Sequence, residues 1–454
     1  MLMTRQGNAQ PGDSGLLSAM LAGENFWPTE PRTLLELGLS EPFLDAFLCR
    51  LLLSGGNMTG RQVEQDVCIP FRIVETLLEK LRARRLLAHC GSASLNDYVY
   101  GLTDEGRKRA QVYHNECAYV GPAPVPLMDY VISVEAQAIG DEPIRRSDLQ
   151  DAFYSVSIST DLLDMLGPAV NSGSGLFLYG APGNGKSTLA RCITSCFGQE
   201  IWIPHAIMDG REIITLFDPS YHILVDQAEN APGYDRRWVR VRRPTVVVGG
   251  ELTMDNLEIR HDPVSNISEA PLQMKSNGGC LLIDDFGRQR ISPTDLLNRW
   301  IIPLENRHDF LTLSSGKKIQ VPFEQLIIFS TNLDPSDLVD EAFLRRIPYR
   351  IEVGDPDAAE FHRLFQISAD KLGCVYDQDT VEYCLEHYYR AESRPLRRCH
   401  ARDLLLQIRH HCTYHDLPFE MRRDYLDAVA GCFFTRVRTR SLAPGGGLSV
   451  PDRR

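Results

Sequence analysis

The spacing of apolar and polar residues changes several times along the chain. Residues 1–32 are rich in Gly, Pro and polar side chains, which predicts a disordered N-terminus. From Glu41, apolar residues recur at helical spacing in three short stretches. Two strand-like runs, 86–89 and 97–102, then flank a polar turn, and another helical stretch follows. Residues 33–118 are therefore predicted to be a domain of three helices, a hairpin and a closing helix.

The rest of the chain shows four further patterns. Residues 119–126 contain closely spaced Pro and Gly and are predicted to be a linker. Residues 127–355 combine helical stretches with short apolar runs, each long enough for one buried strand, so an α/β domain is expected there. Residues 356–436 are predicted to be four amphipathic helices. Residues 437–454, with several arginines and a Gly run, are expected to be a flexible basic tail.

Composition narrows the class of protein. The chain has 454 residues, of which 43% are hydrophobic and 24% charged, as in ordinary globular proteins of two or three domains. It has no long apolar run and no signal-peptide core, so no membrane span and a cytoplasmic location are expected. Its 12 cysteines are scattered, which indicates reduced thiols. The net charge of −12 argues against a globally basic nucleic-acid binder but permits a local basic patch.

One glycine-rich turn carries specific chemistry. The segment 180–187 fits G-x-x-x-x-G-K-[ST], the Walker A motif, between an apolar run at 176–179 and a helical pattern. In such a loop backbone N–H groups surround a polyphosphate, Lys186 reaches the β- and γ-phosphates, and the Ser187 hydroxyl binds Mg²⁺. The predicted ligands are ATP and Mg²⁺. The predicted nucleotide-binding residues are Gly180, Pro182, Gly183, Asn184, Gly185, Lys186, Ser187 and Thr188.

A second apolar run, 279–283, ends in two carboxylates, Asp284 and Asp285. This is the Walker B arrangement, in which the strand brings Asp284 to the Mg²⁺ ion and Asp285 polarises the attacking water. The interval between the two motifs is longer than a basic α/β nucleotide-binding fold requires. An insertion is therefore predicted within residues 203–275.

A third apolar run, 326–331, ends in Asn332, whose amide is suited to orienting the water. The order of these three motifs resembles the AAA+ ATPase superfamily, with Asn332 as sensor 1, and the resemblance covers residues 127 to about 436. It implies an α/β P-loop core with a C-terminal α-helical lid. Many relatives have Glu where this chain has Asp285, which puts fast hydrolysis in doubt.

The resemblance also implies two catalytic arginines. The segment 340–347 is similar to the one that carries the arginine finger, with Arg346 preferred and Arg345 as the alternative. A finger acts on a neighbouring subunit, so a homo-oligomeric ring is expected. The opposing interpretation is that these arginines pair with Asp340 or Glu341. Arg402 resembles the sensor-2 residue of the lid.

Two further segments bear on partners. Residues 310–323 alternate about a Gly turn and resemble the presensor-1 hairpin of the branch that includes MoxR-type ATPases. Lys317 and Lys318 at its tip either touch a threaded polymer or form an ordinary charged turn. Within the insertion, Trp238, Arg240 and Arg242 share one face of a strand by period-two alternation. This strand either binds nucleic acid or is a charged, solvated edge.

The N-terminal domain resembles a winged helix-turn-helix. The third helix and its end carry five basic residues suited to phosphate contacts: Arg72, Lys80, Arg82, Arg84 and Arg85. Residues 39–116 nevertheless balance ten basic against ten acidic side chains. DNA binding and protein docking therefore both remain open.

These features predict an ATP hydrolase that couples ATP binding and hydrolysis to the remodelling of a partner protein or complex. The alternative is an ATP-switched DNA-binding regulator or loader that uses the winged helix and hydrolyses ATP slowly. In both, Asp285, Asn332, Arg346 and Arg402 are the predicted catalytic residues, and Ser187 and Asp284 hold Mg²⁺.

Overall fold

The structure is a computed structural model, and it forms two compact units. The first contains the chain up to Ala181 and Lys186–Val353, and the second contains Pro182–Gly185 and the chain from Gly354 onward. The described residues are 26–139, 143–154, 156–173, 175–197, 200–225, 233–339 and 341–434. The expectations for residues 1–25 and for the tail at 437–454 lie outside these ranges. Among the described helices, none has the length and apolar character that a membrane crossing requires.

The N-terminal domain contains the helices and the hairpin that the periodicity predicts. Its elements are α2 (Leu34–Leu37), α3 (Glu41–Gly55), β1 (Met58–Thr59), α4 (Gly60–Val67), α5 (Phe71–Ala83), β2 (Leu87–Ala93), β3 (Asp97–Leu102) and α6 (Asp104–Glu116). The strands form one antiparallel sheet in the order β1-β3-β2. The Ser40 hydroxyl accepts from the Phe43 N–H at the start of α3, and Thr59 and Gln62 form a reciprocal capping box on α4.

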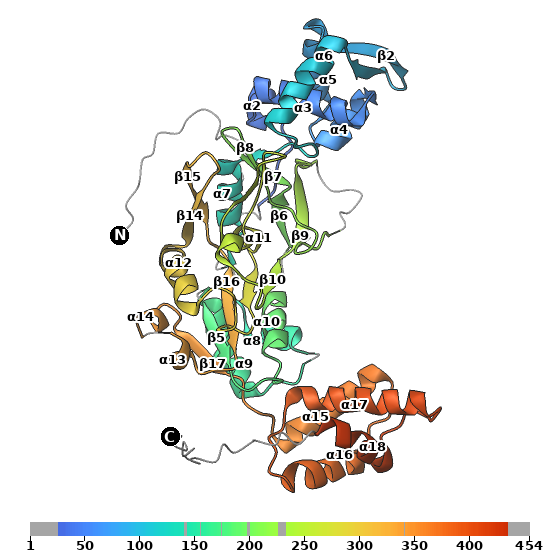
Figure 1. Ribbon diagram of the computed structural model, residues 1–454, viewed down its shortest axis with the longest axis vertical. Coiled ribbons are helices and arrows are strands. Elements are labelled where there is room, and N and C mark those ends of the chain that lie inside the picture. Colours follow the sequence, from blue (N-terminus) through green and yellow to red (C-terminus); the bar gives the residue numbers. More distant parts are fainter. Residues whose placement is uncertain are drawn as a thin grey trace, which may run out of the picture. The chain divides into compact units, whose positions relative to one another are not determined.

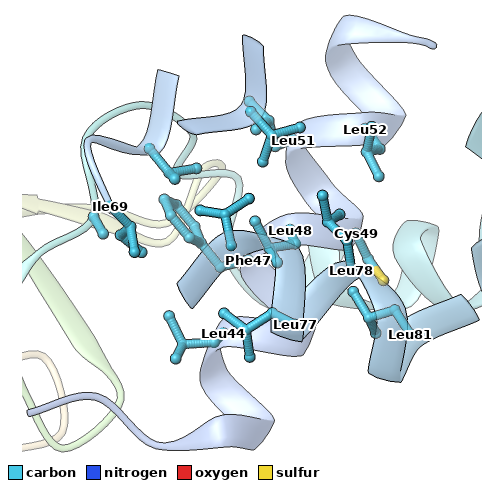
Figure 2. Close-up of a cluster of buried hydrophobic side chains, with 14 of the residues drawn as sticks. Leu44, Phe47, Leu48, Cys49, Leu51, Leu52, Ile69, Leu77, Leu78 and Leu81 are labelled. Atoms are coloured by element: carbon cyan, nitrogen blue, oxygen red, sulfur yellow. The ribbon is translucent and has the colours of Figure 1, made fainter. Parts of the chain in front are cut away.

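The core of this domain lies between α3 and α5. Leu44, Phe47 and Leu48 of α3 are fully buried, as are Leu77 and Leu81 of α5. Figure 2 shows these side chains interleaved from the two helices. Each contributes about 1.5–3 kcal/mol through burial. The helical spacing read from the sequence thus marks the buried faces.

The stretch predicted to be a linker is packed against its neighbours. Tyr119, Ala123 and Val125 are buried. The Tyr119 hydroxyl donates to the Pro122 carbonyl at 2.7 Å. β4 (Val125–Pro126) pairs in parallel with β7 (Ala206–Asp209). The prediction of a linker at residues 119–126 therefore needs correction, because the apolar residues between the prolines are used in sheet pairing and burial.

The predicted N-terminal disorder also ends earlier than expected. Phe26 is buried, and its ring centroid lies 5.4 Å from that of Trp238. Trp27 contacts Trp202 edge-on at 5.3 Å, and Thr29 forms an antiparallel bridge with Tyr234. Residues 26–32 thus pack on the insertion, because two large aromatic rings bury enough apolar area to hold this polar segment in place.

A parallel sheet forms the centre of the α/β domain (Figure 1). Its strands, in spatial order, are β10 (Thr245–Val248), β13 (Cys280–Ile283), β16 (Leu326–Thr331), β5 (Leu176–Tyr179) and β17 (Tyr349–Glu352). Both faces are covered, so period-two alternation divides the apolar residues into two cores. Leu176 and Leu178 pack with α9 (Thr160–Asn171) and α10 (Lys186–Ser195). Phe177 packs with α12 (Pro293–Asn306).

The insertion builds a second sheet. The order is β11 (Arg260–Asp262), β12 (Ile267–Glu269), β8 (Glu212–Thr215), β7 and β4. β6 (Glu200–Pro204) pairs with β9 (Trp238–Arg242), and β14 (His308–Thr312) forms a hairpin with β15 (Lys318–Pro322). One apolar core joins this sheet, the hairpin and α7 (Leu127–Ala136). β10 lies inside the predicted interval 203–275 but belongs to the parallel sheet.

The C-terminal helices have a core of their own. They are α15 (Ala358–Leu372), α16 (Gln378–Cys384), the π-helical η3 (Leu385–Arg390), α17 (Arg398–Tyr414) and α18 (Arg423–Phe433). The remaining short elements among the described residues are α8 (Arg146–Ala152), η2 (Met254–Leu257), α11 (Leu272–Lys275), α13 (Pro335–Leu338) and α14 (Glu341–Leu344).

Candidate nucleotide-binding site

The candidate site lies at the carboxyl edge of the parallel sheet. β16 pairs with β5 on one side and with β13 on the other, and all three strands run the same way. The loops that follow them therefore emerge at the same edge. Because β16 is central, Asn332 lies between the loop after β5 and the carboxylates after β13. This is the placement that the sequence motifs predict.

Glycines shape the loop between β5 and α10. Gly180, Gly183 and Gly185 have φ angles of 132°, 84° and 80°, which side-chain-bearing residues rarely adopt. A Cβ on Gly180 would lie 2.6 Å from the Val353 carbonyl oxygen, so the strand–loop junction has no room for one. A Cβ on Gly185 would meet nothing within 4 Å. The backbone beside Lys186 is therefore open to a ligand, as phosphate binding requires.

Lys186 is buried at the first turn of α10. Its ammonium donates to the Gly180 carbonyl at 2.9 Å, the Ala181 carbonyl at 3.1 Å and Asn332 Oδ1 at 2.7 Å. A buried ammonium is costly unless its donors are satisfied, and these three acceptors satisfy them. The carbonyls are therefore positions that phosphate oxygens can replace when a nucleotide binds.

Ser187 and Asp284 face each other across the site. The Ser187 hydroxyl donates to Asp284 Oδ2 at 2.6 Å. A hydroxyl and a carboxylate at this separation are the two oxygen ligands that a P-loop site offers to Mg²⁺. The residues present thus fit the predicted magnesium ion.

Asp285 is held by the residue predicted to work with it. Asn332 Nδ2 donates to Asp285 Oδ1 at 3.0 Å. Asp285 has a φ of 50°, an uncommon conformation that Asp tolerates better than most residues. Gln289 supports the turn by donating to the carbonyls of Asp284 and Asp285 at 2.8 and 3.1 Å. The sequence motifs did not indicate Gln289, because its role depends on the turn and not on a spacing pattern.

Within the second unit, the loop segment 182–185 is held by residues other than the predicted Arg402. Asn184 Nδ2 donates to Asp355 Oδ1 at 2.7 Å, and the Arg397 guanidinium also binds this carboxylate. The Cys399 N–H donates to the Gly183 carbonyl at 2.9 Å. Of these residues only Gly183 and Asn184 were predicted from the sequence, although the two arginines that directly follow Pro395-Leu396 were a usable signal.

Arg402 lies one turn farther along α17. Its side chain is 65% exposed and pairs with Asp403 at 2.8 Å. Among the described contacts, none joins Arg402 to residues 182–185.

Thr188, a predicted nucleotide contact, lies two residues after Lys186. Its side chain is exposed and therefore accessible to a ligand.

The two candidate finger arginines differ in their surroundings. Arg346 Nε donates to Glu305 Oε1 at 2.7 Å, from α14's end to α12. The predicted alternative named Asp340 or Glu341 as the partner; Asp340 lies outside the described residues, and the carboxylate bound to Arg346 here is that of Glu305. Arg345 is exposed.

The hairpin β14–β15 is tied to the insertion at its tip. Lys317 pairs with Asp209 at 2.5 Å, and Ser314 donates through its N–H and its hydroxyl to Glu212 at 3.0 and 2.9 Å. Lys318 is exposed. Of the two predicted tip lysines, only Lys318 is therefore without an ion pair among the described residues.

Several candidate nucleic-acid contacts are used internally. Trp238 is 3% exposed and cannot stack on a base, and Arg240 pairs with Glu200 at 2.7 Å. In the N-terminal domain Lys80 pairs with Glu41 at 2.6 Å. Two more of the predicted basic residues are engaged: Arg84 with Asp45, and Arg72 with the Arg32 carbonyl. The interpretation of the Trp238 face as a stacking surface is therefore wrong.

Comparisons with known proteins find only distant similarities. A family model described as a domain of unknown function (DUF8689) matches residues 357–431, and no curated protein matches the chain. A mutant of RuvB from Thermotoga maritima is similar at 13% identity and a TM-score of 0.37, over 60% of this chain and 69% of that one. NtrX from Brucella abortus in complex with ATP is similar at 15% identity and a TM-score of 0.37, over 62% and 58%. Both are AAA+ P-loop ATPases. Likeness at this level supports no inference about activity, which has to rest on the residues of this chain.

Proposed function

We propose that this protein is an ATP hydrolase of the AAA+ type. One observation supports this most strongly. Three segments far apart in the sequence bring Lys186, Ser187, Asp284, Asp285 and Asn332 into one network with bonds of 2.6 to 3.0 Å. Structural ion pairs can also form such networks, but these residues begin α10 after β5 or directly follow β13 and β16, at the sheet edge where a P-loop protein binds its nucleotide.

Each side chain has a distinct role in the proposed reaction. When bound, Mg²⁺–ATP supplies a γ-phosphoryl group that water can attack. Lys186 exchanges its carbonyl acceptors for phosphate oxygens, and Ser187 and Asp284 hold the metal. The Asp285 carboxylate accepts the proton of the attacking water, and Asn332 fixes that carboxylate and orients the water.

Two variants test the activity. Lys186→Ala is expected to abolish tight ATP binding, because the buried ammonium has no substitute among the residues it contacts. Asp285→Asn is expected to keep ATP affinity and to lower single-turnover hydrolysis about 10²- to 10⁴-fold. Lys318→Ala, which removes an exposed lysine charge at the tip of the β14–β15 hairpin, is the matched control. Normal ATP affinity in the Lys186 variant would refute the assignment.

We further propose that the active form is a homo-oligomer in which Arg346 completes a neighbour's site. Glu305 holds the guanidinium in the single chain, so a partner's nucleotide has to compete for it. Mixing Arg346→Ala chains with Asp285→Asn chains tests this, because each variant keeps the group that the other lacks. Recovery of hydrolysis on mixing is expected. No recovery, or equal loss in Arg345→Ala, would contradict the role of Arg346.

The N-terminal domain, proposed to be a winged helix, fits protein docking better than DNA docking. Three of the five basic residues on and after α5 are already bound: Lys80 and Arg84 within the domain, and Arg72 to the Arg32 carbonyl just before it. Remodelling of a protein partner is therefore the preferred use of ATP. Retention of a partner protein by the ATP-trapped Asp285→Asn variant, insensitive to nuclease, supports it. Salt-dependent DNA retention that is lost in Arg82→Ala/Arg85→Ala would favour the DNA-binding regulator instead.

A further inference from the structure

A separate hollow lies at the C-terminal end of α10. Lys186 and Ser187 stand at the N-terminal end of this helix, and its ten residues span about 15 Å. The hollow has a volume of about 450 Å³, within the range of small-ligand sites. Its walls come from α10, the end of β9, the start of β10 and the segment 220–223. Figure 1 shows α10 beside β10.

The charge in this hollow favours an anion. Arg191, Arg242 and Arg243 line it. Glu200 is the one acidic side chain among the described lining residues, and it pairs with Arg240 at 2.7 Å. Among the described residues, neither Arg191 nor Arg242 has an ion-pair partner, and both are exposed. Two guanidinium groups with free donors at one hollow are suited to a phosphate, which accepts bidentate hydrogen bonds from arginine.

The third arginine, Arg243, is held in place by the backbone. Arg243 Nη1 donates to the Gln137 carbonyl at 3.0 Å and to the Gly278 carbonyl at 2.6 Å. These bonds join α7's end and the turn before β13 to the start of β10. Arg243 therefore adds positive charge to the hollow at a position set by the fold, whereas Arg191 and Arg242 can adjust to a ligand.

An aromatic ring completes the site. Tyr221 lines the hollow and is half-buried. Lys275 Nζ lies 5.3 Å from its ring centroid, and Lys275 is itself held by Asp218 at 2.8 Å and Glu269 at 2.6 Å. The ring is thus anchored before any ligand arrives. Ile223, 61% exposed, adds apolar surface beside it. A ring and an aliphatic side chain next to free arginines match a planar base attached to a phosphate.

We propose that this hollow binds one nucleotide unit, with its phosphate on Arg191 and Arg242 and its base against Tyr221. The unit is either a free mononucleotide or one residue of a single-stranded nucleic acid, since both present the same base and phosphate. The site is distinct from the one at Lys186 and does not depend on ATP hydrolysis. α10 connects the two, so occupancy of one end is positioned to influence the other.

The test uses the full chain with Lys186→Ala, which removes nucleotide binding at the first site. The probes are a fluorescein-labelled oligothymidylate of about 12 nucleotides, followed by anisotropy, and thymidine monophosphate, followed by calorimetry. Binding of at least one probe is expected. Arg191→Ala/Arg242→Ala should weaken it roughly tenfold or more, since hydrogen bonds between arginine and phosphate are among the strong ones. The dependence of binding on salt should also become shallower.

Two controls separate this site from general charge effects. Arg363→Ala/Arg409→Ala removes the same charge from the C-terminal helices and should leave binding unchanged. Tyr221→Ala should abolish the preference for the oligothymidylate over an abasic strand of equal length, and Tyr221→Phe should retain it. Binding of the oligothymidylate alone identifies a strand, and binding of the monophosphate alone identifies a free nucleotide. No binding of either probe, equal binding by the double variant, or equal binding of the abasic strand where the oligothymidylate binds would overturn the proposal.

Discussion

The two ends of α10 use polar side chains in opposite ways. At the N-terminal end, Lys186 and Ser187 are bonded to Asn332 and Asp284. At the C-terminal end, Arg191 lines a hollow, and its guanidinium has no ion-pair partner among the described residues. A ligand at the first end has to exchange internal bonds for its own, whereas a ligand at the second end meets donors already free. Hydrogen bonds within the protein therefore fix the geometry of the reacting groups at the first end. At the second end, arginine charge that is unpaired among the described residues favours the binding of an anion.

The largest effect that tests this contrast is expected at Ser187. Ser187→Ala removes the hydroxyl that faces Asp284, so Mg²⁺-dependent hydrolysis should fall about 10²- to 10³-fold, as when one preorganised polar group is lost. Steady-state ATPase assays across a Mg²⁺ titration measure this. Ser195→Ala is the matched control on the same helix, because that hydroxyl donates to the Cys192 carbonyl at 2.7 Å. Equal rates in the two variants would remove the distinction between the ends.

A smaller loss is expected at Asn332. Asn332→Ala releases both Lys186 and Asp285, so the hydrolysis rate should fall about 10²-fold while ATP affinity changes little. Rates from single-turnover assays and affinity from nucleotide titration separate the two effects. Leu333→Ala, beside it and 47% exposed, is the control. A fall in affinity without a fall in rate would show that Asn332 serves only to hold Lys186.

The candidate nucleotide-site residues could be singled out in the sequence because their motifs are local. Gly180, Lys186 and Ser187 stand within one loop, and Asp284 and Asn332 directly follow apolar runs. Parallel pairing then brings these strand ends together, which general sheet geometry implies. The sequence could not indicate that Asp355 would hold the loop, since that contact spans 171 positions from Asn184 and follows no repeating pattern.

Contacts between residues far apart in the sequence also explain the two segments whose packing differed from expectation. Residues 119–126 have the composition of a linker, and residues 26–32 that of a disordered end. Both are ordered by partners far along the chain: β7 for the first, and Trp202, Tyr234 and Trp238 for the second. Composition reports local preference, whereas these segments are stabilised by tertiary burial.

Intermediate losses of ATP affinity are expected for variants of the residues that hold the loop segment 182–185. Asp355→Ala removes the acceptor shared by Asn184 and Arg397, so the loop should lose its fixed shape and ATP affinity should fall roughly tenfold. Arg402→Ala should change affinity less than about twofold, because that side chain is exposed and pairs only with its neighbour among the described residues. Nucleotide titration of both variants compares them. A greater loss in Arg402→Ala would restore the sensor-2 role expected from the resemblance.

The smallest expected effect is a change in the pH dependence of the free energy of unfolding, caused by His222 near the hollow. Burial lowers the pKa of His222 below its usual value, although its ring accepts from the Asp218 N–H and faces the Lys275 carbonyl. The unfolded chain therefore binds the extra proton more readily, and stability falls as the pH drops through about 6.5 and below. Urea unfolding between pH about 7.5 and 5 should show this slope.

His222→Gln should make that slope shallower. Some slope should remain, because burial also lowers the pKa of His205. The exposed His410→Gln is the control and should leave the slope unchanged. An unaltered slope in His222→Gln would place the acid sensitivity elsewhere in the chain.

β4 has a consequence for how the protein can be divided. Two residues of the predicted linker, Val125 and Pro126, form an edge strand on β7. A fragment that starts after Pro126 would leave the backbone of Ala206–Asp209 without this partner and with an open edge, which favours aggregation. The N-terminal domain and the α/β domain are therefore not independent modules, and a gene fusion that exchanges the N-terminal domain must keep residues 119–126 with the α/β domain.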